Sequence, residues 1–287
     1  MNYQEPLFRP PAEAESLIFQ VAYGCPHNRC RFCGMYKRVR YRLRPEEEVL
    51  AEIADAGRRY PGPARVFLAD GDCMALPFDR QKRYLEALNR AFPALARVGS
   101  YANGSSIQNR TDGELVELRR LRLHTLYLGL ESGSQEVLDL FGKSEQVEGM
   151  IEAVQRAQAA GLRLSVMVLI GLGGRALRQS HIEQTAAALN RMQPRLLSAL
   201  RFIPIPGLPF PPGFEPVTEQ EAVEELHELI GLLKLERTVF RANHTSNPVP
   251  LSGRLPQDRE RLCRELEYEL ASGALDRNGP GILPFEL

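Results

Sequence analysis

Short apolar runs alternate along the chain with longer segments in which apolar residues recur at helical spacing. The apolar runs predict six strands, over residues 17–23, 65–70, 97–101, 125–130, 162–169 and 196–203. The amphipathic segments between them predict helices over residues 45–60, 78–90, 112–121, 144–160 and 178–192. Strands that alternate with helices favour an α/β protein whose parallel strands are joined by right-handed crossovers.

The number of these strand–helix units limits the architecture. Six units are too few for the usual closed barrel of eight, so we expect an open or partial (β/α)6 barrel. In such sheets ligands bind at the carboxyl ends of the strands, and the loops that follow the strands should hold the chemistry.

The pattern changes after the sixth strand. A proline-rich link with Pro204, Pro206, Pro209, Pro211 and Pro212 precedes expected helices near 218–235 and 256–272, with an irregular polar stretch over 241–250 between them. We therefore predict a barrel core over 1–205, with an N-terminal arm over 1–16. The remainder, 206–287, is predicted to be a C-terminal helical extension that packs on the barrel.

Three of the five cysteines lie in one loop directly after the first predicted strand: Cys25, Cys30 and Cys33. Soft thiolates suit iron–sulfur and zinc centres, and a 4Fe–4S cluster normally takes four of them. Three thiolates would leave one iron open to a substrate or cofactor. Zinc is the alternative, with His27 as a fourth ligand, although the second separated ligand pair that zinc sites usually have is missing from the sequence.

At these residues the sequence resembles the radical S-adenosylmethionine (SAM) superfamily. That family has three cysteines after the first barrel strand and an aromatic residue just before the third, where this chain has Phe32. The usual spacing places three residues between the first two cysteines, whereas Cys25 and Cys30 enclose four. The strings Cys-Gly-Met-Tyr-Lys, Asp-Gly-Asp and Asn-His-Thr-Ser-Asn resemble a little-characterised group of single-domain members.

The resemblance extends to the end of the second predicted strand. Asp70, Gly71 and Asp72 lie where the family often has a turn whose backbone and acid contact the amino group of methionine. Gly71 would let the backbone approach a ligand closely, and either acid would neutralise the ammonium. The alternative is an ordinary Asp-Gly turn.

The fourth and fifth predicted strands end in similar family segments. Glu131 and Ser132 lie in a Gly-Leu-Glu-Ser-Gly string, and the resemblance implies contacts with the ribose or methionine part of SAM. Gly171 begins a glycine cluster in the region where the family contacts adenine, and Arg175 would pair with the methionine carboxylate. An acid that only caps the next helix and a solvated arginine are the alternatives.

Two further residues are candidates for catalysis. Cys73 follows Asp72, where it would donate a hydrogen atom to a substrate radical or simply pack. His244 would line the active site from the C-terminal extension, or belong to a hydrogen-bonded turn. The segment 29–44 contains seven basic residues and no acid, which indicates either a solvated face or a positive mouth for an anionic substrate or an acidic electron donor.

The resemblance implies a radical SAM enzyme with a 4Fe–4S cluster on the three loop cysteines and SAM on the fourth iron. Reductive cleavage of SAM would give a 5′-deoxyadenosyl radical that abstracts hydrogen from a small-molecule substrate, with a reducing electron donor such as flavodoxin or ferredoxin. The alternative is a non-catalytic iron–sulfur or zinc-binding redox sensor, in which the Glu131 and 171–175 loops bind no ligand.

The net charge and the cysteine content limit the binding partners and the cellular compartment that we expect. The 36 basic and 36 acidic residues cancel, so no global field favours nucleic acid or an anionic membrane. We see no signal peptide and no apolar stretch long enough for a membrane span. An odd number of cysteines, three of them clustered, argues against a disulfide framework and for a reducing, cytoplasmic location.

Overall fold

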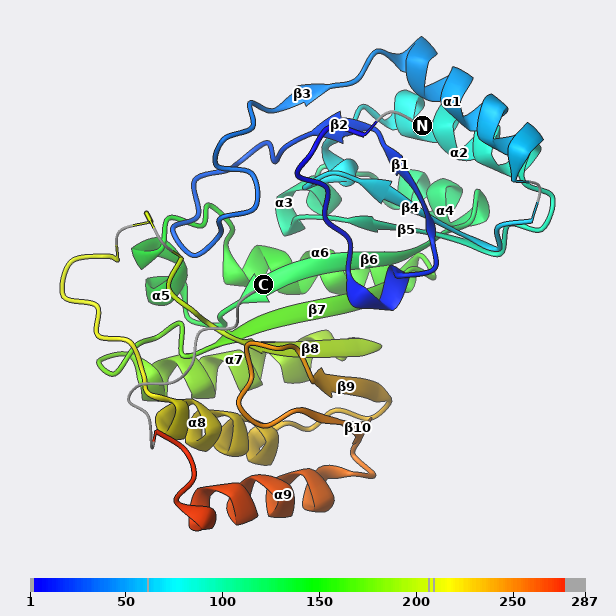
Figure 1. The fold of residues 1–287 in the computed structure, drawn as a ribbon. Helices are drawn as coiled ribbons and strands as arrows, with labels where there is room; N and C mark the ends of the chain where they lie inside the picture. The colour runs from blue at the N-terminus through cyan, green and yellow to red at the C-terminus, as the bar shows by residue number, and fades with distance from the viewer. Residues whose placement is uncertain (1–2, 61, 206, 209, 277–287) are drawn as a thin grey trace. The chain divides into compact units, whose positions relative to one another are not determined.

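The computed structural model describes residues 3–60, 62–205, 207–208 and 210–276 (Figure 1). Pro206 and Pro209 of the predicted proline-rich link lie outside the described residues. The chain divides into two compact units, which are described separately. Of the described residues, the first unit holds those within 1–29, 33–128 and 152–164, and the second holds those within 30–32, 129–151 and 165–287.

The first unit is built on parallel strands joined by helices. β1 (Leu17–Gln20) pairs with β4 (Arg65–Ala69), β4 pairs with β5 (Arg97–Tyr101), and β5 pairs with β6 (Leu123–Glu131). The helices that connect or cover these strands are α1 (Glu46–Arg59), α2 (Phe78–Ala91), α3 (Gly104–Gln108) and α4 (Asp112–Arg120). Two 3-10 turns, η1 (Pro11–Glu13) and η2 (Cys73–Ala75), and a short antiparallel pair, β2 (Ala22–Tyr23) with β3 (Arg42–Leu43), complete it.

The second unit continues the same alternation of strands and helices and ends with an antiparallel strand pair. β7 (Arg163–Ile170) pairs in parallel with β8 (Leu196–Arg201), and β8 pairs in parallel with β9 (Thr238–Ala242). β9 then forms an antiparallel pair with β10 (Leu251–Leu255). The helices are α5 (Gln135–Leu140), α7 (Arg178–Met192), α8 (Glu219–Leu232) and α9 (Arg259–Ser272), and α8 packs beside both α7 and α9 (Figure 1). Helix α6 (Val147–Ala159) begins in the second unit and belongs to the first unit from residue 152 onward.

The period-two alternation of the strands separates a covered face from the face that presents polar groups. On β6, Leu126, Leu128 and Leu130 are fully buried. Tyr127 and Glu131 alternate with them and so point to the opposite face of the strand. The same strand therefore supplies core side chains to one side and candidate functional side chains to the other.

The predicted α/β fold with a mostly parallel sheet is confirmed. All six predicted strands and the five helices between them are present, with shifts of one or two residues at most ends. Among the described residues, eight strands form a sheet in the order β1-β4-β5-β6-β7-β8-β9-β10 rather than a closed barrel. The predicted division at residue 205 stays a prediction.

The sequence analysis missed β9 and β10. The stretch from 241 to 250, which was expected to be irregular, begins inside β9 at Arg241. In this strand Thr238, Phe240 and Ala242 are buried while Arg241 is exposed, which is the alternation of a half-buried strand. The polar residues interleaved with so few apolar ones hide that alternation in the sequence, and the predicted helical extension is a helix pair with a β-hairpin.

Candidate functional site

The cysteine loop, residues 24–41, leaves the first unit's sheet region at β2 and returns at β3. Asn28 has a left-handed φ of 45°, a conformation that asparagine tolerates better than most residues. Its Nδ2 donates to the carbonyls of Tyr36, at 2.6 Å, and Val39, at 3.4 Å. Lys37 Nζ donates to the Asn28 carbonyl at 3.1 Å. These bonds close the loop on itself, so its path is fixed by main-chain acceptors.

The three loop cysteines are partly exposed, and none of the chain's five cysteines forms a disulfide. Partly exposed thiols in a loop rich in arginine and glycine suit the soft metals that bind thiolate, and this donor set fits an iron–sulfur cluster. Within the described ranges, no three His, Cys, Asp or Glu side chains are grouped so that they could hold a metal ion. The ligand roles of Cys25, Cys30 and Cys33 therefore stay predictions.

Asp70 follows β4 and anchors both ends of the cysteine loop. Its carboxylate is buried, and Oδ2 accepts hydrogen bonds from Gln20 Nε2 at 2.8 Å and from the Gly24 amide at 3.2 Å. Oδ1 accepts from the buried Tyr36 hydroxyl at 3.1 Å. Burial raises the pKa of Asp70 to about 6, and these neutral donors oppose that rise.

Gly71 packs directly against the first cysteine. A Cβ at this position would lie 2.7 Å from Cys25 Cβ and 2.9 Å from Cys25 Cα, closer than real side chains approach. The Gly71 amide also donates to the Gly24 carbonyl at 3.2 Å. The close approach expected at this glycine is therefore made to the cysteine loop, while its predicted contact with SAM stays a prediction.

Asp72 and Cys73 are buried in the same segment. Asp72 Oδ1 accepts from the Met74 amide at 3.1 Å, and Oδ2 accepts from Asn103 Nδ2 at 3.0 Å and from Ser106. The Cys73 thiol lies 3.1 Å from the Leu68 carbonyl, and burial raises its pKa well above the ordinary value. Cys73 is thus held as a neutral thiol, and its hydrogen-donor role stays a prediction, as does an ammonium contact by Asp70 or Asp72.

In the second unit, Glu131 ends β6 in a strained conformation. Its φ is 62°, in the left-handed region that a non-glycine residue rarely adopts. Gly129 permits this arrangement, because a Cβ there would collide with the Glu131 carboxylate. Strain of this kind costs about 1–3 kcal/mol and is concentrated at functional sites, which agrees with the site interpretation of Glu131.

The Glu131 carboxylate is paired with a buried cation. Lys143 Nζ lies 3.4 Å from Glu131 Oε1, and both side chains are largely shielded from solvent. Burial raises the pKa of Glu131, and the Lys143 ammonium opposes that rise. The same ammonium lies 5.8 Å from the centroid of the Phe32 ring, within the range of a cation–π contact.

Phe32, the aromatic residue before the third cysteine, packs in an apolar cluster of the second unit. Its ring centroid lies 6.1 Å from that of Phe141, which is buried with Val137, Leu172 and Phe202. The Arg31 amide donates to the Phe141 carbonyl at 2.8 Å. Residues 30–32 are therefore fixed by both apolar and main-chain contacts, and a cofactor contact by Phe32 stays a prediction.

Ser132, Gly171 and Arg175 all have partners inside the second unit. Ser132 Oγ lies 2.7 Å from His181 Nδ1, and the Gly171 amide donates to Glu225 Oε1 at 2.6 Å. Arg175 is half-exposed and forms an ion pair with Glu221, with Nε 2.9 Å from Oε1. The roles of these three residues toward SAM stay predictions.

His244 belongs to a hydrogen-bonded turn after β9. Its Nδ1 lies 2.8 Å from Ser246 Oγ and accepts from the Ser246 amide at 3.1 Å. Asn247 Nδ2 donates to the carbonyls of Ala199 and Ala242, both at 2.9 Å, and so ties the turn to β8 and β9. Partial burial lowers the pKa of His244, and its place in the active site stays a prediction.

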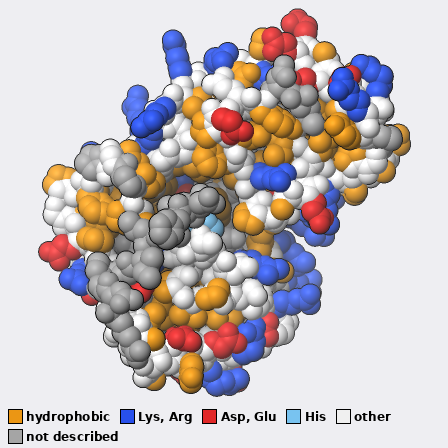
Figure 2. Space-filling view, in the orientation of Figure 1, with side chains coloured by type: hydrophobic (Ala, Val, Ile, Leu, Met, Phe, Trp, Pro, Cys, Tyr) orange, Lys and Arg blue, Asp and Glu red, His pale blue; other side chains and the backbone are white. Residues whose placement is uncertain are grey.

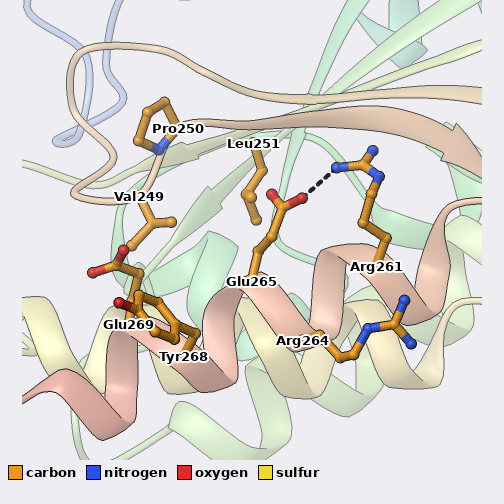
Figure 3. A pocket seen from close by; sticks show the side chains of 8 residues that line it. All are labelled: Val249, Pro250, Leu251, Arg261, Arg264, Glu265, Tyr268 and Glu269. Carbon is orange, nitrogen blue, oxygen red and sulfur yellow. Dashed lines mark hydrogen bonds and ion pairs between the residues drawn. The ribbon is translucent and has the colours of Figure 1, made fainter.

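A surface pocket of about 410 Å³ lies between α9 and the segment that leads into β10 (Figure 3). Val249 and Pro250 form one wall, and Tyr268 lies on the other, where the Arg261 guanidinium donates to Glu265 at 2.6 Å. None of the predicted site residues lines it. The strand ends, rather than this pocket, hold the candidate chemistry.

Sequence reasoning missed several residues that shape the site. Gln20, Asn28 and Tyr36 fix the cysteine loop, and Glu225 holds the Gly171 amide. Asn28 and Tyr36 lie in the cysteine loop and Gln20 lies in the first predicted strand, but no local pattern indicates their contacts. Glu225 is 54 residues from Gly171, so no local pattern could have indicated the contact.

The mostly parallel sheet and the helices between its strands define the class as an α/β protein, with three cysteines in the loop that follows its first strands. The sequence model of the Radical SAM superfamily matches residues 19–186, more than half of the chain. The chain therefore belongs to the radical SAM superfamily, whose cofactors are a 4Fe–4S cluster and SAM.

The chain is also similar to individual characterised proteins. The chain is 26% identical over 229 residues to the anaerobic magnesium-protoporphyrin IX monomethyl ester cyclase of Cereibacter sphaeroides, covering 78% of this chain and 35% of that protein. It is 21% identical over 175 residues to the heme chaperone HemW of Bacillus subtilis, covering 58% and 45%. The chain thus spans less than half the length of these relatives.

Solved structures share the fold. Coproporphyrinogen III oxidase (HemN) from Escherichia coli superposes with a TM-score of 0.59 and 16% identity, covering 75% of this chain and 51% of that chain. Methylornithine synthase (PylB) gives a TM-score of 0.54 and 15% identity, covering 88% and 81%. None of the helices in the part of the chain that the structure describes is long and apolar enough to span a membrane.

Proposed function

We propose that this chain is a radical SAM enzyme, with Cys25, Cys30 and Cys33 as the ligands of a 4Fe–4S cluster. When bound, the cluster and SAM supply reductive cleavage of the sulfonium to methionine and a 5′-deoxyadenosyl radical, which removes hydrogen from a small-molecule substrate. The observation that carries the proposal is the cysteine loop locked to the end of β4 by Asp70 and Gly71, in a chain that matches the superfamily over residues 19–186.

Residues of the first unit hold the cysteine loop at Gly24, Cys25 and Tyr36. Asp70 binds the Gly24 amide on one side of the loop and the Tyr36 hydroxyl on the other. Gly71 packs against the Cβ and Cα of Cys25, so the first predicted ligand lies directly against the strand end. Restraining the backbone around this ligand lowers the entropy cost of binding the cofactor.

The residues of the second unit would orient SAM. In this proposal Glu131 accepts hydrogen bonds from the ribose hydroxyls or binds the methionine part, Ser132 lies beside it, and the backbone of Gly171 faces the adenine. The Lys143 ammonium favours the charged, accepting form of the Glu131 carboxylate and so opposes burial, which raises the pKa of that group. Arg175 would exchange its partner Glu221 for the methionine carboxylate.

The electron donor in this proposal is an acidic redox protein such as flavodoxin or ferredoxin. Five arginines of the cysteine-loop region are exposed: Arg29, Arg31, Arg38, Arg40 and Arg42. Arg44, the last of the seven basic residues, is instead buried and paired with Glu52 at 2.8 Å, so it is structural. Both signs of charge occur across the face in view in Figure 2. We place the protein in a reducing compartment, the cytoplasm, because its thiols must stay reduced.

The test is anaerobic reconstitution with iron and sulfide, followed by chemical reduction, addition of SAM and detection of 5′-deoxyadenosine by mass spectrometry. We expect 5′-deoxyadenosine from the wild type and from Cys263→Ala, whose cysteine lies on α9 and is not part of the cysteine loop. We expect none from Cys30→Ala. A loaded, reducible cluster that yields no 5′-deoxyadenosine would contradict the proposal and favour the redox sensor.

A further inference from the structure

A buried polar network lies where β6 and β7 end in the second unit. Ser132, His181 and Glu225 are each no more than 2% exposed. His181 Nδ1 lies 2.7 Å from Ser132 Oγ, and Nε2 lies 3.1 Å from the Leu169 carbonyl and 3.3 Å from Glu225 Oε1. The network therefore joins side chains that are 49 and 44 residues apart in the sequence, one before His181 and one after it.

The partners of the imidazole determine its tautomer. The Leu169 carbonyl and the Glu225 carboxylate can only accept, so Nε2 holds a proton. Ser132 Oγ accepts from the Ser134 amide at 3.0 Å, and in the neutral imidazole its hydroxyl proton donates to Nδ1. Every contact is satisfied in this way, and the Ser132 side chain is held in one orientation.

Glu225 extends the network to the glycine loop. Its Oε1 accepts from the Gly171 amide at 2.6 Å, a short charge-assisted bond to the first residue of the 171–175 loop. Its Oε2 is buried and has no hydrogen-bond partner among the described residues. Burying a carboxylate oxygen without a hydrogen-bond partner costs free energy. We therefore expect Glu225 to have a role that offsets this cost.

Helix α7 makes a second contact with the turn that follows β6. The Gly133 amide donates to Thr185 Oγ1 at 2.8 Å, one turn beyond His181. A Cβ at Gly133 would lie 2.2 Å from the backbone carbonyl oxygen of Gln184 in α7, so the turn after β6 packs directly against this helix. Both turns that follow β6 and β7 are thus fastened to α7 and α8 by buried side chains.

We propose that His181 and Glu225 are positioning residues for SAM: His181 orients Ser132 beside Glu131, and Glu225 fixes the backbone of Gly171. This inference rests on the proposed function, in which these two strand ends bind SAM. It gives α8, which lies in the C-terminal part of the chain, a direct share in shaping the cofactor site. Neither residue touches the cofactor; each acts through a neighbour.

The first test uses two variants of Glu225 and a control on the same helix. Glu225→Leu should weaken SAM binding to the reconstituted, oxidised protein by roughly tenfold, the loss of one charge-assisted hydrogen bond, with iron content unchanged. Glu225→Gln keeps an oxygen acceptor for the Gly171 amide and should restore most of the affinity. Glu228→Gln, which removes a charge that pairs with Arg178, should bind SAM like the wild type.

Amide hydrogen exchange in the absence of SAM measures how firmly Glu225 holds the Gly171 amide. The peptide that contains Gly171 should exchange faster in Glu225→Leu and at the wild-type rate in Glu228→Gln. His181→Phe provides a second route if Glu225→Leu fails to fold. It should weaken SAM binding while the Gly171–Glu225 bond, and hence the exchange of that amide, is kept.

The outcomes separate this inference from the proposed function. Wild type that binds SAM, with Glu225→Leu and His181→Phe that bind it equally well, would overturn the positioning roles and leave the proposed function standing. Wild type that carries a cluster and binds no SAM would overturn the proposed function and the inference with it. Weaker binding in Glu225→Leu that Glu225→Gln reverses supports both.

Discussion

The two units each bury an acid at a strand end, but they hold it in different ways. Asp70 in the first unit accepts hydrogen bonds from neutral donors, those of Gln20, Gly24 and Tyr36, and the pKa of its carboxyl is raised to about 6. Glu131 in the second unit faces the ammonium of Lys143 from a left-handed backbone. Burial raises the pKa of Glu131 as well, but the Lys143 ammonium opposes that rise. The first acid thus organises a loop, whereas the second has a cation beside it that favours its charged, hydrogen-bond-accepting form.

This difference predicts separate consequences when each region is disturbed. Changes around Asp70 and Gly71 should affect the loading of iron, because these residues hold the loop of the predicted ligands. Changes around Glu131 should affect the binding of SAM and leave the iron content intact. Substitutions at Gly71 and Glu131 and the pH dependence of Asp70 test this separation.

The largest effect is expected for Gly71→Ala. The added methyl group would lie 2.7 Å from Cys25 Cβ, so Cys25 must move and the reconstituted iron content should fall to a small fraction of the wild-type value. The matched control is Gly113→Ala, at a glycine where a Cβ meets nothing within 4 Å. Iron is measured per chain after anaerobic reconstitution, and equal loading of the two variants would contradict the role given to Gly71.

Next in size is the effect of Glu131→Gln. The substitution leaves the Lys143 ammonium buried without its carboxylate, and removal of one partner of a buried pair typically costs about 3–5 kcal/mol. The free energy of unfolding, measured by denaturant titration, should fall accordingly, and SAM affinity should fall as well. Glu148→Gln, which breaks a surface pair with Arg191, should leave both unchanged. Lower iron loading in Glu131→Gln, with normal SAM binding, would reverse the separation proposed for the two units.

The smallest effect is a pH dependence that belongs to Asp70. Its folded pKa is raised above the ordinary value, so its contribution to stability is fully present below about pH 4 and is lost as the pH rises through about 6. The free energy of unfolding of the metal-free wild type should therefore decline across this window relative to Asp70→Asn, and the two curves should run parallel above it. Parallel curves from pH 4 to 7 would show that Asp70 ionises as freely in the folded chain as in the unfolded one.

Much of the fold and the outline of the site could be predicted from the sequence. The apolar runs located all six parallel strands, and the strand-end strings located Cys25, Asp70 and Glu131. The hairpin of β9 and β10 was missed because alternation over five residues, with arginine or serine in the exposed positions, is weaker than the polar composition around it.

The contacts that fix the site could not be predicted, for a physical reason. Gln20 reaches Asp70 across 50 residues, and Glu225 reaches Gly171 across 54. Such contacts depend on which strands and helices become neighbours, and a single sequence contains no local pattern for that. The left-handed backbone of Glu131 likewise follows from no local pattern. Only the structure shows that the absence of a side chain at Gly129 leaves room for the Glu131 carboxylate.

The central claim is that the cysteine loop binds a 4Fe–4S cluster, and metal analysis tests it most directly. Iron, acid-labile sulfide and zinc should be measured in anaerobically reconstituted wild type, in Cys25→Ala, Cys30→Ala and Cys33→Ala, and in Cys263→Ala as the control. We predict about four irons and four sulfides per chain for the wild type and Cys263→Ala, and almost none for the three loop variants. Stoichiometric zinc in the wild type, or a full complement of iron in Cys30→Ala, would contradict the claim.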